Sequence, residues 1–264
     1  MKLNTPGSLN TLNQMQLQQD NLLKKLATAK RINSAADDAA GLQIANQLSS
    51  SINASAQGER NLYDGMSLAR VYEQGLQGIN DNLGELNRLA VAAGNGIYGA
   101  QERAALQAEA DQYTANIKQT IDTTEFGGKK LFGQDGSLNF GTGSGNMSFN
   151  TADVEAGLTA QNAFSINLSS ASAAALSLEN IKTSLDYVSG LQAEAGASIN
   201  SFSSAASSLN GQQIATSAAR SRIEDLDFAR ATSDKVAADI LGKTSTSVAL
   251  QARVQHQQAL DLLS

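Results

Sequence analysis

The chain lacks cysteine and tryptophan altogether, and aromatic residues make up only 5% of its 264 residues. The absence of cysteine excludes disulfides, thiolate nucleophiles and sulfur-ligated metals. A single histidine, His256 in a glutamine-rich run, excludes a multi-histidine metal site and is expected on a polar face. So few aromatic residues supply a large compact core poorly, which points away from a globular enzyme.

A basic block is also missing, since the 19 lysines and arginines are scattered and the net charge is −6. Nucleic-acid binding is therefore not expected. No run approaches the roughly 18 apolar residues that span a bilayer, so no membrane segment is expected. The first six residues lead into Asn and Gln rather than into an apolar core, so we expect no cleaved secretory signal.

Paired carboxylates occur at Asp37/Asp38 and Glu224/Asp225, but neighbouring residues do not face each other on a helix. We interpret them as acids at helix starts, where the helix dipole favours negative charge. The sequence therefore predicts no enzyme, no cofactor and no metal site.

Small and apolar residues recur at steps of three and four along two long stretches near the two ends of the chain. This spacing gives each helix a narrow apolar seam, which packs helices nearly parallel with knobs in holes. The predicted fold is mainly α, a long antiparallel helical rod resembling a coiled-coil bundle. The seam residues are Leu62, Met66, Leu76, Ile79, Leu83 and Leu86 on the N-terminal side and Ile199, Phe202 and Leu209 on the C-terminal side.

Capping patterns and glycines predict where the helices begin and end. Ser34 and Asp37 have capping-box spacing, as have Ser221 and Glu224, and each pair predicts a joint where a helix starts. Between the joints, helices are expected from about 35 to 93, from about 100 to 123 and from about 173 to 219. Gly-rich turns at 94–96 and 127–128 should end the first two.

The middle of the chain is glycine-rich and has a different character. Short runs at 137–140 and 147–149 predict small β-hairpins, and 164–168 is a further strand candidate. The turn at 141–145 matches neither known glycine-rich phosphate loop. The expected organisation is an N-terminal inner helix (1–34), two halves of a rod (35–130 and 173–220), a hairpin region (131–172) and a C-terminal inner helix (221–264).

Five segments resemble the signatures of bacterial flagellins. They cover both ends of the chain in the family's order, over roughly residues 20–131 and 175–264. The segments are 31–45 (RINSAADDAAGLQIA), 61–69 (NLYDGMSLA), 125–131 (EFGGKKL), 221–229 (SRIEDLDFA) and 246–252 (TSVALQA).

The resemblance implies a structural subunit that polymerises into the flagellar filament outside the cell. It implies partners as well: other copies of the chain, the flagellar type III export apparatus, an export chaperone, the filament cap and the hook-associated proteins. Both termini should stay disordered until they form a coiled coil lining the filament channel, because weakly apolar helices are marginal alone. The inner-core subunit contacts would be Leu22, Leu26, Val248, Leu250, Val254 and Leu260.

Two departures from the family pattern stand out. The segment before Lys24 is several residues shorter than usual, and the middle of about 45 residues leaves no room for large outer domains. Because flagellins are often O-glycosylated in their outer part, the hairpin hydroxyls are candidate sites. They are Ser137, Thr142, Ser144, Ser148 and Thr151.

A surface recognised by a Toll-like innate receptor is similar to residues 81–91 and the helix around Glu109. Leu89 and Glu109 match its apolar and acidic contact positions, but Glu85 replaces an arginine. We therefore expect weak recognition by the receptor.

Three other functions compete with a filament subunit. A hook–filament junction protein shares the N-terminal pattern but not the two C-terminal motifs. An enzyme, as in flagellins with a metallopeptidase insert, would need a His-Glu-x-x-His motif that this chain lacks. A helical signalling rod would lack the glycine-rich hairpins.

Overall fold

The computed structural model describes residues 5–261, with the side chains of 13–248, 250, 251, 254, 255 and 258. The chain divides into two compact units. The first contains the described residues up to Ile52 and from Ile214 onward, and the second contains Asn53–Gln213. Two long helices each contribute to both units, so the divisions fall within them rather than at the predicted joints.

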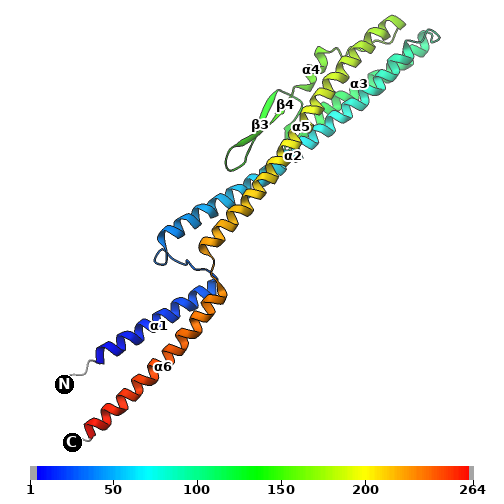
Figure 1. The fold of residues 1–264 in the computed structure, drawn as a ribbon. Helices are drawn as coiled ribbons and strands as arrows, with labels where there is room; N and C mark the ends of the chain where they lie inside the picture. Colours follow the sequence, from blue (N-terminus) through cyan, green and yellow to red (C-terminus); the bar gives the residue numbers. More distant parts are fainter. Residues whose placement is uncertain (1–4, 262–264) are drawn as a thin grey trace. The chain divides into compact units, whose positions relative to one another are not determined.

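The predicted fold class is confirmed: long helices dominate and two small antiparallel hairpins lie in the middle of the sequence (Figure 1). In chain order the elements are α1 (Thr5–Thr28), α2 (Ala39–Ala93), α3 (Ala100–Thr123), β1 (Glu125–Phe126), β2 (Lys129–Lys130), β3 (Gly136–Gly141), β4 (Asn146–Thr151), α4 (Val154–Ala160), α5 (Ala171–Glu224) and α6 (Phe228–Asp261).

The core of the protein lies in the second unit, where α2, α3 and α5 run side by side (Figure 1). Seam residues of α2 are almost fully buried, from Leu62 to Leu86, and Phe202 and Leu209 of α5 are buried opposite them, while Ile199 is half-buried. Asn80 of α2 donates to Gln192 of α5 across the seam at 3.3 Å. The second unit is thus an antiparallel helical bundle.

An aromatic cluster joins the hairpin region to this bundle. The ring of Tyr72 on α2 lies 4.8 Å from that of Phe132 and 5.3 Å from that of Phe149 on β4. All three side chains are buried. Aromatic pairs at these separations stabilise beyond the area they bury, so the hairpin region is part of the core.

The first hairpin explains a pair of glycines that the sequence assigned to a helix end. Helix α3 ends earlier, at Thr123, and Gly127 and Gly128 form the turn between β1 and β2 with φ of +58° and +78°. Two consecutive left-handed residues are what a two-residue hairpin turn demands, and glycine adopts them without strain.

The second hairpin pairs β3 with β4, with Leu138 opposite Phe149. Its turn packs against α2. A Cβ added to Gly58 would meet the Thr142 carbonyl carbon at 2.5 Å, and one added to Gly143 would meet the Ala54 carbonyl oxygen at 2.7 Å. Asn61 also donates to the Gly141 carbonyl at 2.8 Å. The predicted hairpin is therefore present, and its turn is packed against α2.

Residues 164–168, where a strand was expected, form no strand in the structure. The amide of Asn167 donates to Ser177 Oγ at 2.9 Å, and that of Leu168 donates to Gln107 Oε1 at 2.7 Å. Side-chain acceptors therefore replace a strand partner. The short helix α4 was not predicted. Its N-cap is Asp153, whose carboxylate accepts the Ala156 amide at 2.8 Å.

Candidate functional site

The first unit has very little core of its own. Among its described side chains, the buried apolar residues are Ile32, Ala45 and Ala231. Helices α1 and α6 lie side by side in it (Figure 1), and Gln19 donates to the Ala238 carbonyl at 3.2 Å. A pairing with so few buried side chains is marginal in isolation.

Small residues of α6 occupy its α1-facing side. Ala231 is buried and Ala238 and Gly242 are half-buried there. A Cβ added to Gly242 would lie 3.0 Å from the Gln19 amide nitrogen. The larger apolar residues of α6 whose side chains are described are exposed instead.

Two exposed apolar stripes result. At 100° per residue, Val236, Ile240, Leu250 and Val254 fall within about a quarter of the helix circumference, and Leu241 and Val248 form a second stripe. All six side chains are between 52% and 59% exposed. Exposed apolar side chains that gather on one face are typical of interaction sites. We call these two sets the α6 stripes.

The six expected inner-core contacts do not share one environment in the structure. Val248, Leu250 and Val254 lie in the α6 stripes, whereas Leu22 and Leu26 of α1 are half-buried. The side chain of Leu260 lies outside the described residues. Leu17 and Leu23 of α1 are exposed as well, and they are apolar candidates that were not among the expected inner-core contacts.

A short backbone clasp joins the segment that follows α1 to the end of α5 and the two residues after it. We define the clasp as residues 29–31 and 223–226. Arg31 donates its amide to the Glu224 carbonyl at 2.7 Å, and Leu226 donates its amide to the Ala29 carbonyl at 3.0 Å. The Arg31 guanidinium adds a bond to the Ile223 carbonyl at 2.7 Å.

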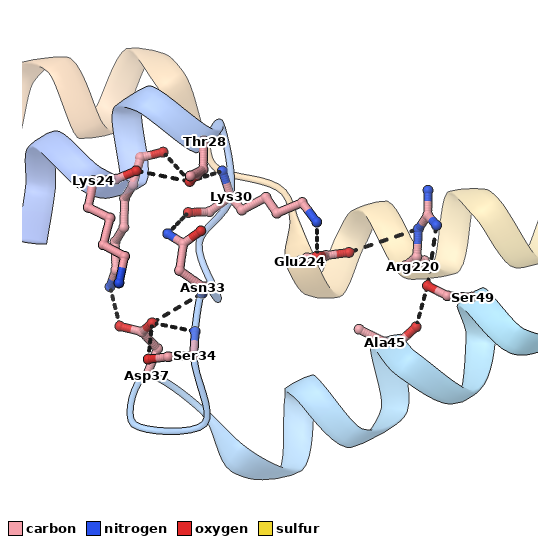
Figure 2. A network of polar contacts seen from close by, with 11 residues as sticks. Lys24, Thr28, Lys30, Asn33, Ser34, Asp37, Ala45, Ser49, Arg220 and Glu224 are labelled. Atoms are coloured by element: carbon pink, nitrogen blue, oxygen red, sulfur yellow. Dashed lines mark hydrogen bonds and ion pairs between the residues drawn. The ribbon is translucent and has the colours of Figure 1, made fainter.

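Charged side chains surround the clasp. The Glu224 carboxylate pairs with Lys30 and lies 3.9 Å from Arg220, which also donates to Ser49 at 3.3 Å (Figure 2). Glu224 therefore links the N-terminal segment to the end of α5. Because most of these side chains are partly exposed, solvent weakens each ion pair.

The predicted capping boxes are both wrong as helix starts. Asp37 does accept the Ser34 amide at 3.0 Å, but within a turn that precedes α2. The N-cap of α2 is Asp38, whose carboxylate accepts the Gly41 amide at 2.8 Å. The backbone amides of Asn33 and Ser34 both donate to the Asp37 carboxylate, and these hydrogen bonds, first of all that from Asn33, lower the pKa of Asp37. An Asp side chain can satisfy a turn as well as a helix end, which the spacing alone does not distinguish.

The second box fails for a different reason. Helix α5 continues through Ser221 to Glu224, and the Ser221 hydroxyl donates to Asp225 at 2.5 Å. The N-cap of α6 is Asp227, which accepts the Arg230 amide at 3.1 Å. Both joints are present, each displaced a few residues toward the C-terminus.

The structure also bears on the surface expected to be recognised by the innate receptor. Arg88 donates to Glu85 at 2.7 Å and to Glu109 at 3.3 Å. The bond to Glu85 is the main cause of the raised pKa of Arg88. Leu89, by contrast, is fully buried in the helical bundle. Its prediction as an apolar contact is wrong, because it faces the seam and not solvent.

Three of the five candidate glycosylation hydroxyls are exposed: Ser137, Ser144 and Ser148. Thr142 is buried and donates to the Gly145 carbonyl at 3.0 Å, so its prediction is wrong. Thr151 is half-buried, with its hydroxyl 3.4 Å from the Gln134 carbonyl.

Within the described ranges, no three His, Asp or Glu side chains come together as metal ligands. No helix in the described part of the chain has the length and apolar character needed to cross a membrane.

These features define a class of protein: a helical subunit whose terminal helices carry apolar surface that one copy leaves uncovered. Residues 4–137 match the family model described as the bacterial flagellin N-terminal helical region, and residues 178–263 match that of the C-terminal helical region. The chain belongs to the bacterial flagellin family, which is a structural family.

Individual relatives agree with this assignment. A B-type flagellin of Pseudomonas aeruginosa is 39% identical over 64% of this chain and 33% of its own length. A flagellin of Serratia marcescens is 32% identical over 67% of this chain and 51% of its own length. The matched region thus spans between a third and a half of these two relatives.

Solved structures show a similar fold at lower identity. A Bacillus cereus flagellin has a TM-score of 0.51 at 23% identity, covering 57% of this chain and 88% of that one. A protein described as a putative flagellar hook-associated protein from Vibrio parahaemolyticus has a TM-score of 0.60 at 15% identity, covering 72% of this chain and all of that one.

Proposed function

We propose that this chain is the structural subunit that polymerises into the bacterial flagellar filament and serves motility outside the cell. The observation that carries the proposal is the pair of α6 stripes, which stay exposed while small residues fill the contact with α1. Burying a Val, Leu or Ile side chain contributes about 1.5 to 3 kcal/mol. Neighbouring copies that cover the stripes would stabilise the first unit where it is weakest.

Polymerisation is tested by a matched pair of variants. Purified full-length protein carrying Leu250→Asp should fail to extend added filament seeds under electron microscopy, because a charge at this exposed apolar position cannot be buried cheaply. Leu250→Met keeps the apolar character and similar volume, so it should extend the seeds normally. Normal filaments from Leu250→Asp would sink the proposal.

A hook–filament junction protein is the second candidate. Its support is the fold similarity to the Vibrio parahaemolyticus structure described as a putative flagellar hook-associated protein. The flagellin C-terminal match over residues 178–263 favours the filament subunit instead. Seeds extended over many subunits by the chain alone would separate the two, because a junction protein occupies a single position between hook and filament.

The partners follow from the same proposal. The chain would interact with other copies of itself, with hook-associated proteins and the filament cap, and with an export chaperone and the type III export apparatus. The small core of the first unit supports an export route that handles unfolded chain, since such a unit opens at little cost.

Two further properties are proposed for the surface. The exposed hydroxyls Ser137, Ser144 and Ser148 are the candidate glycosylation sites, and the mass of native filaments would test them. Recognition by the innate receptor would be weak, because Glu85 holds Arg88 in an ion pair at this surface.

A further inference from the structure

The connection between α2 and α3 lies at one end of the second unit (Figure 1) and contains the dipeptide Asn95-Gly96. Both residues are exposed, and the following Ile97 is 87% exposed. A Cβ added to Gly96 would meet nothing within 4 Å. The peptide after Asn95 therefore lies in an exposed turn with open space beside Gly96.

The side chain of Asn95 is held over this peptide. Its Oδ1 accepts the amide of Ile97 at 3.1 Å, which forms an Asx turn and brings the side-chain carbonyl back over the Gly96 amide. The same donor would stabilise negative charge on Oδ1 as it develops, in the manner of an oxyanion hole. Among the described residues, no hydrogen bond occupies the Gly96 amide itself.

We propose that Asn95 is a site of spontaneous deamidation. The Gly96 backbone nitrogen attacks Cγ of Asn95, a nitrogen–carbon bond forms, and the bond from Cγ to Nδ2 breaks. The Gly96 amide proton goes to the departing nitrogen, which leaves as ammonia. Water then opens the cyclic imide at either carbonyl and gives aspartate or isoaspartate at position 95.

The chain contains two internal comparisons that separate the causes. Asn210-Gly211 is also exposed but lies inside α5, where forming the imide requires leaving the helical dihedral angles and breaking helix hydrogen bonds. Asn167 has the same Asx turn, since its Oδ1 accepts the Ser169 amide at 3.0 Å, but buried Leu168 follows it. Asn95 alone of these three combines the turn with the glycine.

The product would change this end of the unit. Arg103 donates to the Ala93 carbonyl at 3.0 Å and to the Asn95 carbonyl at 3.2 Å, so it already lies beside the position where the new carboxylate appears. Either product would add a negative charge near Arg103. Isoaspartate would also lengthen the backbone by one carbon, because its chain runs through Cγ and its free carboxylate is the former Asn95 carbonyl group that Arg103 contacts.

The test is peptide mass spectrometry of the purified full chain during incubation in mildly alkaline buffer. Asn95 should convert at least about tenfold faster than Asn210 and Asn167, a barrier difference of about 1.4 kcal/mol. Hydroxylamine, which cleaves cyclic imides, should cut the chain after residue 95. Comparable conversion at all three positions would overturn the proposal.

A variant isolates the role of glycine. Gly96→Ala has open space for its methyl group and should leave the circular dichroism unchanged while slowing conversion at Asn95. Conversion as fast as in the unaltered chain would contradict the mechanism. So would an unchanged Asn95 under conditions that convert a synthetic peptide of residues 91–100.

Discussion

The hydroxyl oxygen of Tyr72 accepts the backbone amide of Ala152 at 3.2 Å, so helix α2 holds the end of β4 through a single buried side chain. Residues 72 and 152 belong to distant parts of the sequence, and no periodicity links them. The bond fixes the hairpin region on the helical bundle at its aromatic cluster.

Replacing Tyr72 by Phe should destabilise the second unit by about 1 kcal/mol, because the ring stays packed while the Ala152 amide loses its acceptor. Urea unfolding followed by circular dichroism would measure the loss. Unchanged stability would mean that water takes over the bond.

Alkaline pH should destabilise the same unit. Burial raises the pKa of Tyr72 from its ordinary value of 10.0 to about 12. The raised value means that the folded state keeps its proton longer than the unfolded state. The associated stability is therefore fully present below pH 10 and lost as the pH rises toward 12. Tyr72→Phe should remove this part of the pH dependence, and an identical profile in the variant would contradict the assignment.

Two glycines of α2 should respond in opposite directions to alanine. Gly58→Ala places a methyl group against the Thr142 backbone and should destabilise the second unit by about 1 to 3 kcal/mol. Gly84→Ala meets nothing within 4 Å and should stabilise by up to about 1 kcal/mol through helix propensity. Thermal unfolding of the two variants, side by side, checks both signs.

A matched pair of variants tests where the N-cap of α6 lies. Asp227→Ala removes the N-cap and should weaken α6 by about 1 kcal/mol, whereas Ser221→Ala changes a residue inside α5 and should cost much less. Hydrogen exchange of the first amides of α6 would report the difference. Greater loss of protection in Ser221→Ala would restore the capping box that the sequence suggested.

Limited proteolysis of monomer should trim the first unit and spare residues 53–213, because the buried core lies in the second unit. Mass spectrometry of the resistant fragment gives its ends. A C-terminus that remains intact in monomer would show that α1 and α6 need no neighbour.

Receptor activation should rise in Glu85→Arg, which replaces an acid that pairs with Arg88 by the cation that the family's recognised surface carries. A reporter-cell assay compares it with unaltered protein, and Gln101→Arg controls for added charge elsewhere on the exposed surface. Strong and equal activation by all three would remove Glu85 from consideration.

Much of the helical architecture could be predicted from the sequence, because three-and-four spacing is a direct record of helix faces. The bounds of α3 agree with the helix expected from about 100 to 123, although the glycines at 127 and 128, which were expected to end it, form the turn of the first hairpin. The apolar alternation at Phe164, Ile166 and Leu168 led to the wrong prediction of a strand, because an irregular segment can also bury every second residue.

The remaining errors concern contacts between distant residues. Leu89 was placed on a surface by resemblance, although its own spacing from Leu86 puts it on the buried seam. Nothing in the sequence indicates that Gly58 must admit the backbone of residue 142. Both facts depend on which helix faces meet, which a one-dimensional pattern does not contain.

The clasp has a consequence for the order in which the chain folds. Lys30 and Glu224 are 194 residues apart in the sequence, so closing that loop in an unfolded chain costs about 5 kcal/mol of entropy. The few exposed bonds of the clasp offset that cost poorly. It should therefore form only after the intervening helices have folded and shortened the effective loop, which makes clasp formation a late kinetic step and a marker of completed folding.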